Sequence, residues 1–127
     1  MSAPDTKFRI LAVDDSEDIL ALLEVILGKE YEVKSAIDAR TALRLAFEKP
    51  RPDLMLLDVE MPGTSGYDLC RALKASPALA DIPVIFITAY GDAKVRIQAM
   101  REGAVEFLAK PFDHHLLLKR VRAALDM

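Results

Sequence analysis

Asp58 is the first residue whose type and position suggest chemistry, and it directly follows the apolar run Leu54-Met55-Leu56-Leu57. An apolar run of this length between turn-forming residues predicts a strand that is buried on both faces. Asp58 would then lie at the carboxyl end of that strand, which is the edge where ligands bind in open α/β sheets. The sequence therefore places one carboxylate at a predicted binding edge.

Two more carboxylates, Asp14 and Asp15, follow another predicted strand at residues 8–13. Adjacent carboxylates that face a third one raise each other's pKa unless a cation joins them. Mg²⁺ suits such a group because it prefers oxygen ligands and keeps positions for water or phosphate oxygens. The three acidic residues therefore predict a Mg²⁺ site that would accept a phosphoryl group.

Each of these residues also has a simpler structural explanation when it is taken alone. An aspartate after a strand is usually a turn former or a helix cap, and this explanation suits Asp58 or Asp15 singly. Ser16 is available to cap the next helix, so the acidic pair exceeds what capping needs. Lys110 alone could be a surface lysine before a turn, and Thr88 alone could be a strand residue. The functional interpretation depends on these positions occurring together.

Strand and helix patterns alternate five times along the chain. The predicted strands cover residues 8–13, 31–36, 54–57, 83–87 and 105–109. Helices are predicted between and after them, each beginning at a candidate N-cap: Ser16, Asp38, Ser65, Asp92 and Asp113. Short connections and right-handed crossovers indicate an α/β fold, a doubly wound five-stranded parallel sheet flanked by five helices.

Composition limits the class of protein. The 127 residues are 52% hydrophobic and 29% charged, which suits one globular domain with a core. The net charge of −3 gives no basic footprint, so neither nucleic-acid binding nor membrane binding is expected. The single Cys70 cannot form an internal disulfide, and no apolar stretch is long enough for a bilayer span or a signal peptide. We therefore expect a cytoplasmic protein.

Taken together, the residues resemble the receiver domain of bacterial two-component response regulators, which has the fold of the bacterial chemotaxis regulator. The resemblance runs from Phe8 to Leu125 and fills the family's signature positions: Asp14, Asp15, Asp58, Thr88, and Lys110 followed by Pro111. It implies a flavodoxin-like sheet with the strand order 2-1-3-4-5. We expect a single receiver domain over residues 1–127, with its core at 8–125 and a disordered segment at 1–7.

The resemblance implies a role for each acidic residue. Asp58 would be the phospho-acceptor, attacking a phosphohistidine of a sensor histidine kinase or a phosphotransfer protein to form an acyl phosphate. Mg²⁺ would be held by Asp15, Asp58 and the backbone carbonyl of Glu60. Asp14 would act on the ion through a water in its outer shell.

Other residues would contact the phosphoryl group. Lys110 would pair with its oxygens and offset the charge that develops during transfer. The hydroxyl of Thr88 would move to hydrogen-bond one of these oxygens. Backbone N–H groups around Val59 and Ala89 would complete the phosphate cradle.

A signal would then be read through Phe107, which stands three residues before Lys110. In the family, inward movement of the residue at the Thr88 position frees space for an aromatic side chain at this place. The resemblance therefore implies a packing switch on the face formed by the helix after Asp92, the strand at 105–109 and the last helix. This face would bind an output domain or a second copy of the chain.

Two further side chains are placed to tune how long the acyl phosphate lasts. Glu60 stands two residues after Asp58, and Tyr90 stands two residues after Thr88. Glu60 would orient an attacking water or compete for the metal, while the Tyr90 side chain would block access. The sequence leaves the direction of both effects open.

The sequence favours a signalling module over a metabolic enzyme, one that catalyses only its own phosphorylation and dephosphorylation. A phosphate-independent interaction domain is the main alternative, disfavoured because the whole site is present. A metal-dependent phosphatase of the haloacid dehalogenase type would want a second aspartate two residues after the nucleophile, where this chain has Glu60. A flavodoxin-like cofactor binder would want hydrogen-bond donors in place of Asp14-Asp15. No output segment follows Leu125, so a stand-alone receiver or an excised input domain is expected.

Overall fold

The computed structural model describes residues 7–89 and 91–126, which contain five strands and five helices in alternation. The strands are β1 (Arg9–Val13), β2 (Glu32–Ala36), β3 (Leu54–Leu57), β4 (Val84–Thr88) and β5 (Glu106–Ala109). The helices are α1 (Glu17–Leu27), α2 (Ala39–Phe47), α3 (Gly66–Ala75), α4 (Ala93–Arg101) and α5 (His114–Leu125). Residues 1–6 of the predicted N-terminal segment lie outside the described residues.

The strands form one parallel sheet in the order β2-β1-β3-β4-β5, which confirms the predicted topology. Every residue of β3 and β4 is buried, as the unbroken apolar runs predict for central strands. The register pairs Val13 with Leu57 and Thr88 with Ala109. The strands therefore end at a common edge, and the residues that follow them meet there.

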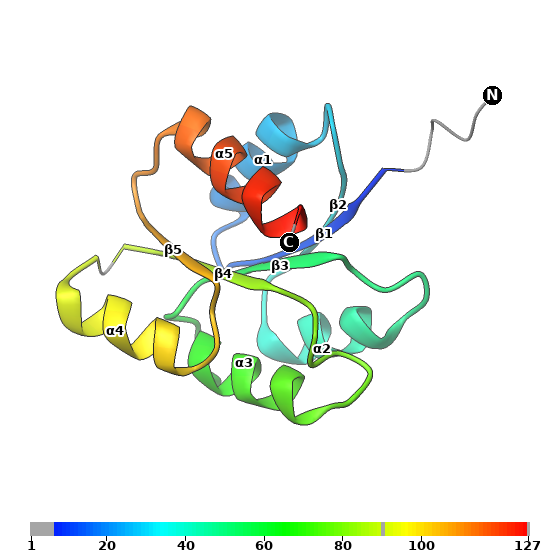
Figure 1. The fold of residues 1–127 in the computed structure, drawn as a ribbon, viewed down its shortest axis with the longest axis vertical. Helices are drawn as coiled ribbons and strands as arrows, with labels where there is room; N and C mark the ends of the chain where they lie inside the picture. The colour runs from blue at the N-terminus through cyan, green and yellow to red at the C-terminus, as the bar shows by residue number, and fades with distance from the viewer. Residues whose placement is uncertain (1–6, 90, 127) are drawn as a thin grey trace.

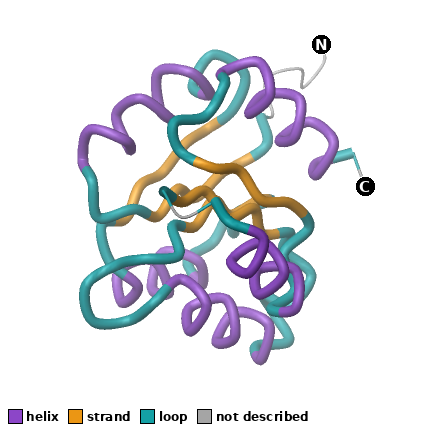
Figure 2. The backbone as a smooth tube through the Cα atoms, turned by 90° about the vertical axis from the view of Figure 1, so that its left-hand side faces the viewer, coloured by secondary structure: helices purple, strands orange, loops and turns teal. Residues whose placement is uncertain are grey.

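Helices cover both faces of the sheet, as a doubly wound fold requires. Helices α1 and α5 lie on one face, and α2, α3 and α4 lie on the other (Figure 1). The view turned by 90° shows the strands between these two helical layers (Figure 2). Side chains alternate along each strand, so Ile10 packs in the core of the first layer and Leu11 in that of the second.

All five predicted N-caps are confirmed. Each side chain accepts a hydrogen bond from the backbone N–H three residues later, as when Asp38 accepts from Thr41 at 2.7 Å. A cap of this kind contributes about 0.5–2 kcal/mol. The short polar residues after each strand therefore fix where the helices begin.

The element boundaries differ from the predicted ones at a few residues. Strand β2 begins at Glu32, because the N–H of Tyr31 donates to Leu27 O at 2.9 Å and belongs to the turn that ends α1. Phe47, the last residue of α2, is 43% exposed, and this helix buries only the small Ala42 and Ala46.

Helix α4 is held by less apolar packing than its neighbours. Ala99 is its one buried residue, while Ile97 and Met100 are exposed. Helix α3 buries Leu69 and Leu73 among others, and full burial of one such side chain contributes about 1.5–3 kcal/mol. Polar contacts must therefore carry much of what holds α4 in place.

The single cysteine and the two histidines have simple structural positions. Cys70 is a buried thiol, and burial raises its pKa, as expected of a small core residue. His114 and His115 are exposed in the first turn of α5. Over residues 7–89 and 91–126, none of the helices has the length and apolarity that a membrane span requires.

Candidate functional site

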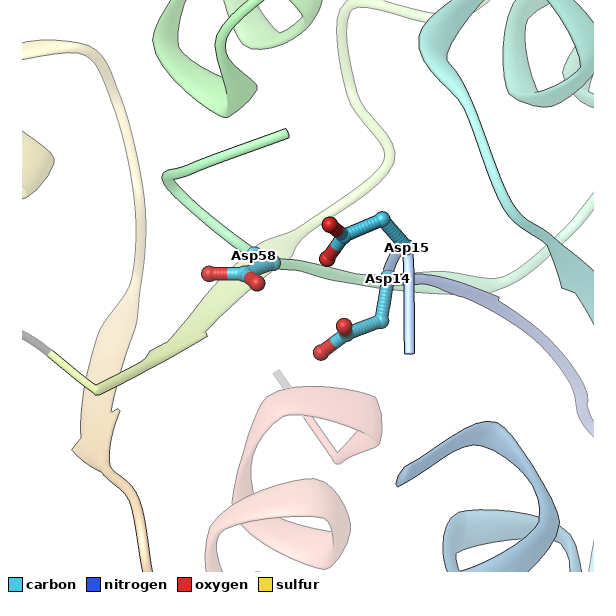
Figure 3. Close-up of side chains that lie close together, drawn as sticks. All are labelled: Asp14, Asp15 and Asp58. Carbon is cyan, nitrogen blue, oxygen red and sulfur yellow. The ribbon is translucent and has the colours of Figure 1, made fainter. Parts of the chain in front are cut away.

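The three carboxylates predicted to share a site lie together at the carboxyl ends of β1 and β3 (Figure 3). Asp14, Asp15 and Asp58 each present an oxygen within 4.8 Å of the others. Backbone pairing fixes two of them, because the N–H of Asp14 donates to Ala36 O at 3.1 Å and that of Asp58 to Val13 O at 3.0 Å. The sheet therefore holds the acidic cluster from its backbone.

Asp58 is 6% exposed, yet both of its carboxylate oxygens have partners. Oδ1 accepts a hydrogen bond from the Glu60 N–H at 3.2 Å. Oδ2 lies 3.3 Å from the Lys110 ammonium. The carboxylate is thus oriented from two sides.

Asp14 is the most buried acid of the cluster, at 2% exposure. Burial raises its pKa, with a contribution from the charge of Asp58, while hydrogen bonds from Lys110 and the Ser16 N–H act in the opposite direction. The Ser16 bond is 2.9 Å long and the Lys110 bond is 2.5 Å. Asp15 is exposed at the rim, so the pair divides into an inner and an outer carboxylate.

Lys110 reaches the acids from the end of β5, where its own N–H donates to Thr88 O at 2.8 Å. Burial opposes the ammonium charge, but Asp14 and Asp58 together outweigh this effect and raise the pKa of Lys110. The sequence predicted Lys110 as a partner of phosphoryl oxygens. Its pairing with Asp14 was not predicted, because nothing in the spacing of two residues 96 positions apart reveals it.

The loop after Asp58 is held by a close approach that the sequence did not predict. The N–H of Gly66 donates to Val59 O at 2.7 Å, and a Cβ at Gly66 would clash with the carbonyl oxygen of Asp58. Glycine is therefore required where α3 begins against the loop that follows Asp58. The signal available in the sequence was a second glycine directly after the N-cap Ser65.

The remaining predicted site residues occupy the same edge or its surroundings. Thr88 ends β4 and is fully buried, and Ala89 after it is exposed. Val59 is buried next to Asp58, while the Glu60 side chain is exposed. Tyr90 lies outside the described residues.

Phe107 is only 4% exposed and packs in the core between the sheet and the layer of α2, α3 and α4. It pairs in register with Phe86, and the Arg96 guanidinium lies 5.9 Å from the centre of its ring. The ring therefore already occupies an inward position in this structure.

The acidic cluster fits a hard divalent cation. Its donors are all carboxylate oxygens, and in the described part of the chain it is the one group of three or more acidic, His or Cys residues close enough to share an ion. Asp15 and Glu60 also line an open pocket beside the cluster. An ion with oxygen ligands and remaining positions for water or phosphate matches both features.

Comparisons with known proteins agree with this geometry. Residues 10–122 match the family described as the response regulator receiver domain. The chain is 48% identical to the response regulator PleD of Caulobacter vibrioides over 116 residues, which are 91% of this chain and 25% of PleD. It is 39% identical to the DNA-binding dual master transcriptional regulator RpaA of Synechocystis, over 92% of this chain and 48% of RpaA.

The fold is also similar to solved structures. A response regulator structure from Chloroflexus aurantiacus superimposes with a TM-score of 0.91 at 34% identity, covering 96% of this chain and all of that one. The chain spans a quarter to a half of the curated relatives named above. On the match over residues 10–122, together with the acidic cluster and its lysine, the chain belongs to the response regulator receiver domain family, a family of signalling domains.

Proposed function

We propose that this domain is the phospho-acceptor of a two-component phosphorelay, in which Asp58 receives a phosphoryl group from a histidine kinase or a phosphotransfer protein. One observation carries the proposal above all. Asp58 is buried at the ligand-binding edge of the sheet, and two further carboxylates and one ammonium group converge on it. A phosphate-independent interaction domain would have no use for this arrangement of buried charge.

In the proposed step, a carboxylate oxygen of Asp58 forms a bond to the phosphorus of a phosphohistidine. The bond between that phosphorus and the imidazole nitrogen breaks, and its electron pair returns to the imidazole. The product is an acyl phosphate on Asp58. The phosphohistidine is the only other reactant, and the group that is modified belongs to the domain itself. The domain therefore catalyses only its own modification.

Mg²⁺ fits the donor set and would be held by Asp15, Asp58 and the backbone carbonyl of Glu60, with Asp14 acting through a water. When bound, it supplies positive charge against the carboxylates and the phosphoryl oxygens. The ammonium of Lys110 lies 3.3 Å from Asp58 and is placed to turn toward the incoming oxygens. Thr88 and the backbone N–H groups around Val59 and Ala89 would complete the cradle.

The proposal is tested by phosphorylating the purified protein with acetyl phosphate. We expect one phosphoryl group per chain by intact-mass spectrometry, dependent on Mg²⁺ and mapped by peptide analysis to Asp58. Unmodified protein under these conditions, or modification that does not require a divalent ion, would contradict the proposal.

We further propose that the signal is read on the face formed by α4, β5 and α5, where an output domain or a second copy would bind. Phe107 is already buried in this structure. Its ring would therefore pack against this face at rest and change its packing when Thr88 moves. We expect a Phe107→Leu variant, which keeps most of the apolar volume, to phosphorylate normally. The change in amide exchange over residues 106–125 that phosphorylation causes should fall to about half or less.

The exposed Phe47→Leu is the matched control for this test, since it lies on α2 and should leave that change intact. Leucine is preferable to alanine at position 107 because a buried Phe→Ala substitution costs about 3–5 kcal/mol. A response over residues 106–125 that is unchanged in Phe107→Leu would sink this part of the proposal.

Glu60 is proposed to shorten the life of the acyl phosphate. Its exposed carboxylate follows Asp58 and lines the open pocket, where it is placed to orient an attacking water as a general base. We expect Glu60→Asn to slow release of inorganic phosphate by up to about 10²-fold, the lower end of what a general base contributes, measured after removal of excess acetyl phosphate. An unchanged rate of release would refute this role.

Nucleic-acid binding has to be considered for this domain separately from the longer relatives that contain such a domain. RpaA is described as DNA-binding, and this chain covers 48% of it. The absence of nucleic-acid binding therefore stays a prediction about this domain, drawn from its net charge of −3.

A further inference from the structure

The first turn of α3 lies between the phospho-acceptor loop and α4. Gly66, its first residue, donates its N–H to Val59 O and packs so closely on the Asp58 carbonyl that no side chain fits there. Tyr67 follows directly and lines the open pocket together with Asp15. Two consecutive residues of one helix therefore border the site, and the second of them extends toward α4.

The Tyr67 side chain makes two specific contacts. Its hydroxyl donates a hydrogen bond to the backbone carbonyl of Val95, in the first turn of α4, at 3.1 Å. Its ring packs edge to face on Phe86 of β4, with ring centroids 5.4 Å apart and an interplanar angle of 70°. The ring is thus anchored in the core, and the hydroxyl is the group that reaches α4.

Helix α3 also holds the other end of α4. The guanidinium of Arg71 donates to both carboxylate oxygens of Glu102, the C-cap of α4, at 2.8 and 2.5 Å. The thiol of Cys70 donates to the carbonyl of the same residue at 3.3 Å. Because Ala99 is the one buried residue of α4, these polar contacts with α3 fix the helix at both ends.

We propose that Tyr67 is a positioning residue that couples the Asp58 loop to the first turn of α4 through its hydrogen bond to the Val95 carbonyl. The reason is mechanical. Gly66 has no side chain that could absorb a displacement of Asp58 and Val59, so a shift of that loop moves the start of α3. Tyr67 is the next residue. When it moves, its hydrogen bond to the Val95 carbonyl either stays intact and moves the first turn of α4, or breaks and frees that turn.

This coupling rests on the proposed function for the event that starts it, the arrival of a phosphoryl group on Asp58. It differs from the Thr88 and Phe107 route because it leaves the site through the loop after β3 and through α3, although the Tyr67 ring also packs on Phe86 of β4. The first turn of α4 lies where the two routes would converge. A residue that holds this turn in its resting position therefore affects how much the turn changes on phosphorylation.

A Tyr67→Phe variant isolates the hydroxyl, since it keeps the ring that packs on Phe86. We expect the unphosphorylated variant to exchange the backbone amides of residues 92–97 about three- to tenfold faster, as the loss of one hydrogen bond predicts. On addition of Mg²⁺ and beryllofluoride, which mimics a phosphoryl group on a carboxylate, the further change at these amides should be less than half that of the wild type.

Tyr31→Phe is the matched control, because it removes the hydroxyl of another tyrosine whose ring packs in the core, in this case beneath α1 and α5. It should leave exchange over residues 92–97 unchanged. If unphosphorylated Tyr67→Phe protein exchanged these amides at the wild-type rate, the hydrogen bond from Tyr67 to Val95 would have no role in holding the first turn of α4. A wild-type response to beryllofluoride in that variant would overturn the coupling.

These results separate the coupling from the proposed function. If acetyl phosphate does not modify wild-type Asp58 and beryllofluoride changes nothing, the phospho-acceptor role fails. The exchange of the unphosphorylated variant still reports on the hydrogen bond to Val95. If Asp58 is modified but Tyr67→Phe behaves as the wild type, the coupling alone is wrong.

Discussion

Replacing Asp58 with asparagine is expected to abolish formation of the acyl phosphate. The amide keeps the size of the side chain and retains one oxygen, which can accept either from the Glu60 N–H or from Lys110. It lacks the ionised oxygen that would attack phosphorus, so the rate should fall at least about a hundredfold, to background. Intact-mass spectrometry after treatment with acetyl phosphate and Mg²⁺ measures this directly.

The substitution also removes one charge from a cluster of three acids, so the variant is expected to fold. Asp81→Asn serves as its control, because Asp81 is an exposed acid in the loop before β4 and has no place in the site. It should be modified at the wild-type rate. If Asp58→Asn protein were phosphorylated as fast as wild type, the phospho-acceptor would have to be sought elsewhere.

The second large effect is expected at Lys110. A Lys110→Met variant keeps a side chain of similar length but loses the ammonium that pairs with Asp14 and Asp58. Loss of one preorganised charged donor from a reacting centre costs about 10²- to 10³-fold in rate. We therefore expect initial phosphorylation by acetyl phosphate to slow by this factor, with the residual modification still on Asp58.

The control for charge is Lys119→Met, since Lys119 is exposed on α5 and away from the acids.

The two carboxylate partners of Lys110 raise its pKa, so its ammonium stays charged above the ordinary lysine range. Its contribution to stability is present below that range and is lost only as the pH rises through the raised pKa. No titration of the rate by Lys110 is thus expected below about pH 10. A Lys110→Met variant with the wild-type rate would show that the ammonium takes no part in transfer.

Much of the fold was predictable because local signals agreed with one another. Apolar runs marked β3 and β4, and short polar residues marked all five helix starts. Sequential parallel strands joined by helices leave few topologies, and the family resemblance implied the observed order. Predictions were weaker at element boundaries, as at Tyr31, which was predicted to begin the second strand but belongs to the turn that ends α1.

The candidate site was predictable for a related reason. Asp14, Asp58 and Lys110 each follow a strand directly, and the ends of parallel strands meet at one edge, so their convergence follows from the topology. Their exact partners do not follow from it. That Lys110 pairs with Asp14 at 2.5 Å as well as with Asp58, and that Phe107 is already buried, depend on side-chain positions that only the packed structure fixes.

The sequence by itself thus determined the chemistry of this protein: an acid cluster suited to Mg²⁺, a candidate phospho-acceptor and a lysine to face it. These properties reside in residue types and in the strands they follow, which are local in the chain. The tertiary structure alone decided how the site connects to the rest of the molecule. The contacts of Gly66 with the Asp58 loop and of Tyr67 with α4 join segments that are distant in the chain, and no local pattern specifies such a contact before the helices have packed.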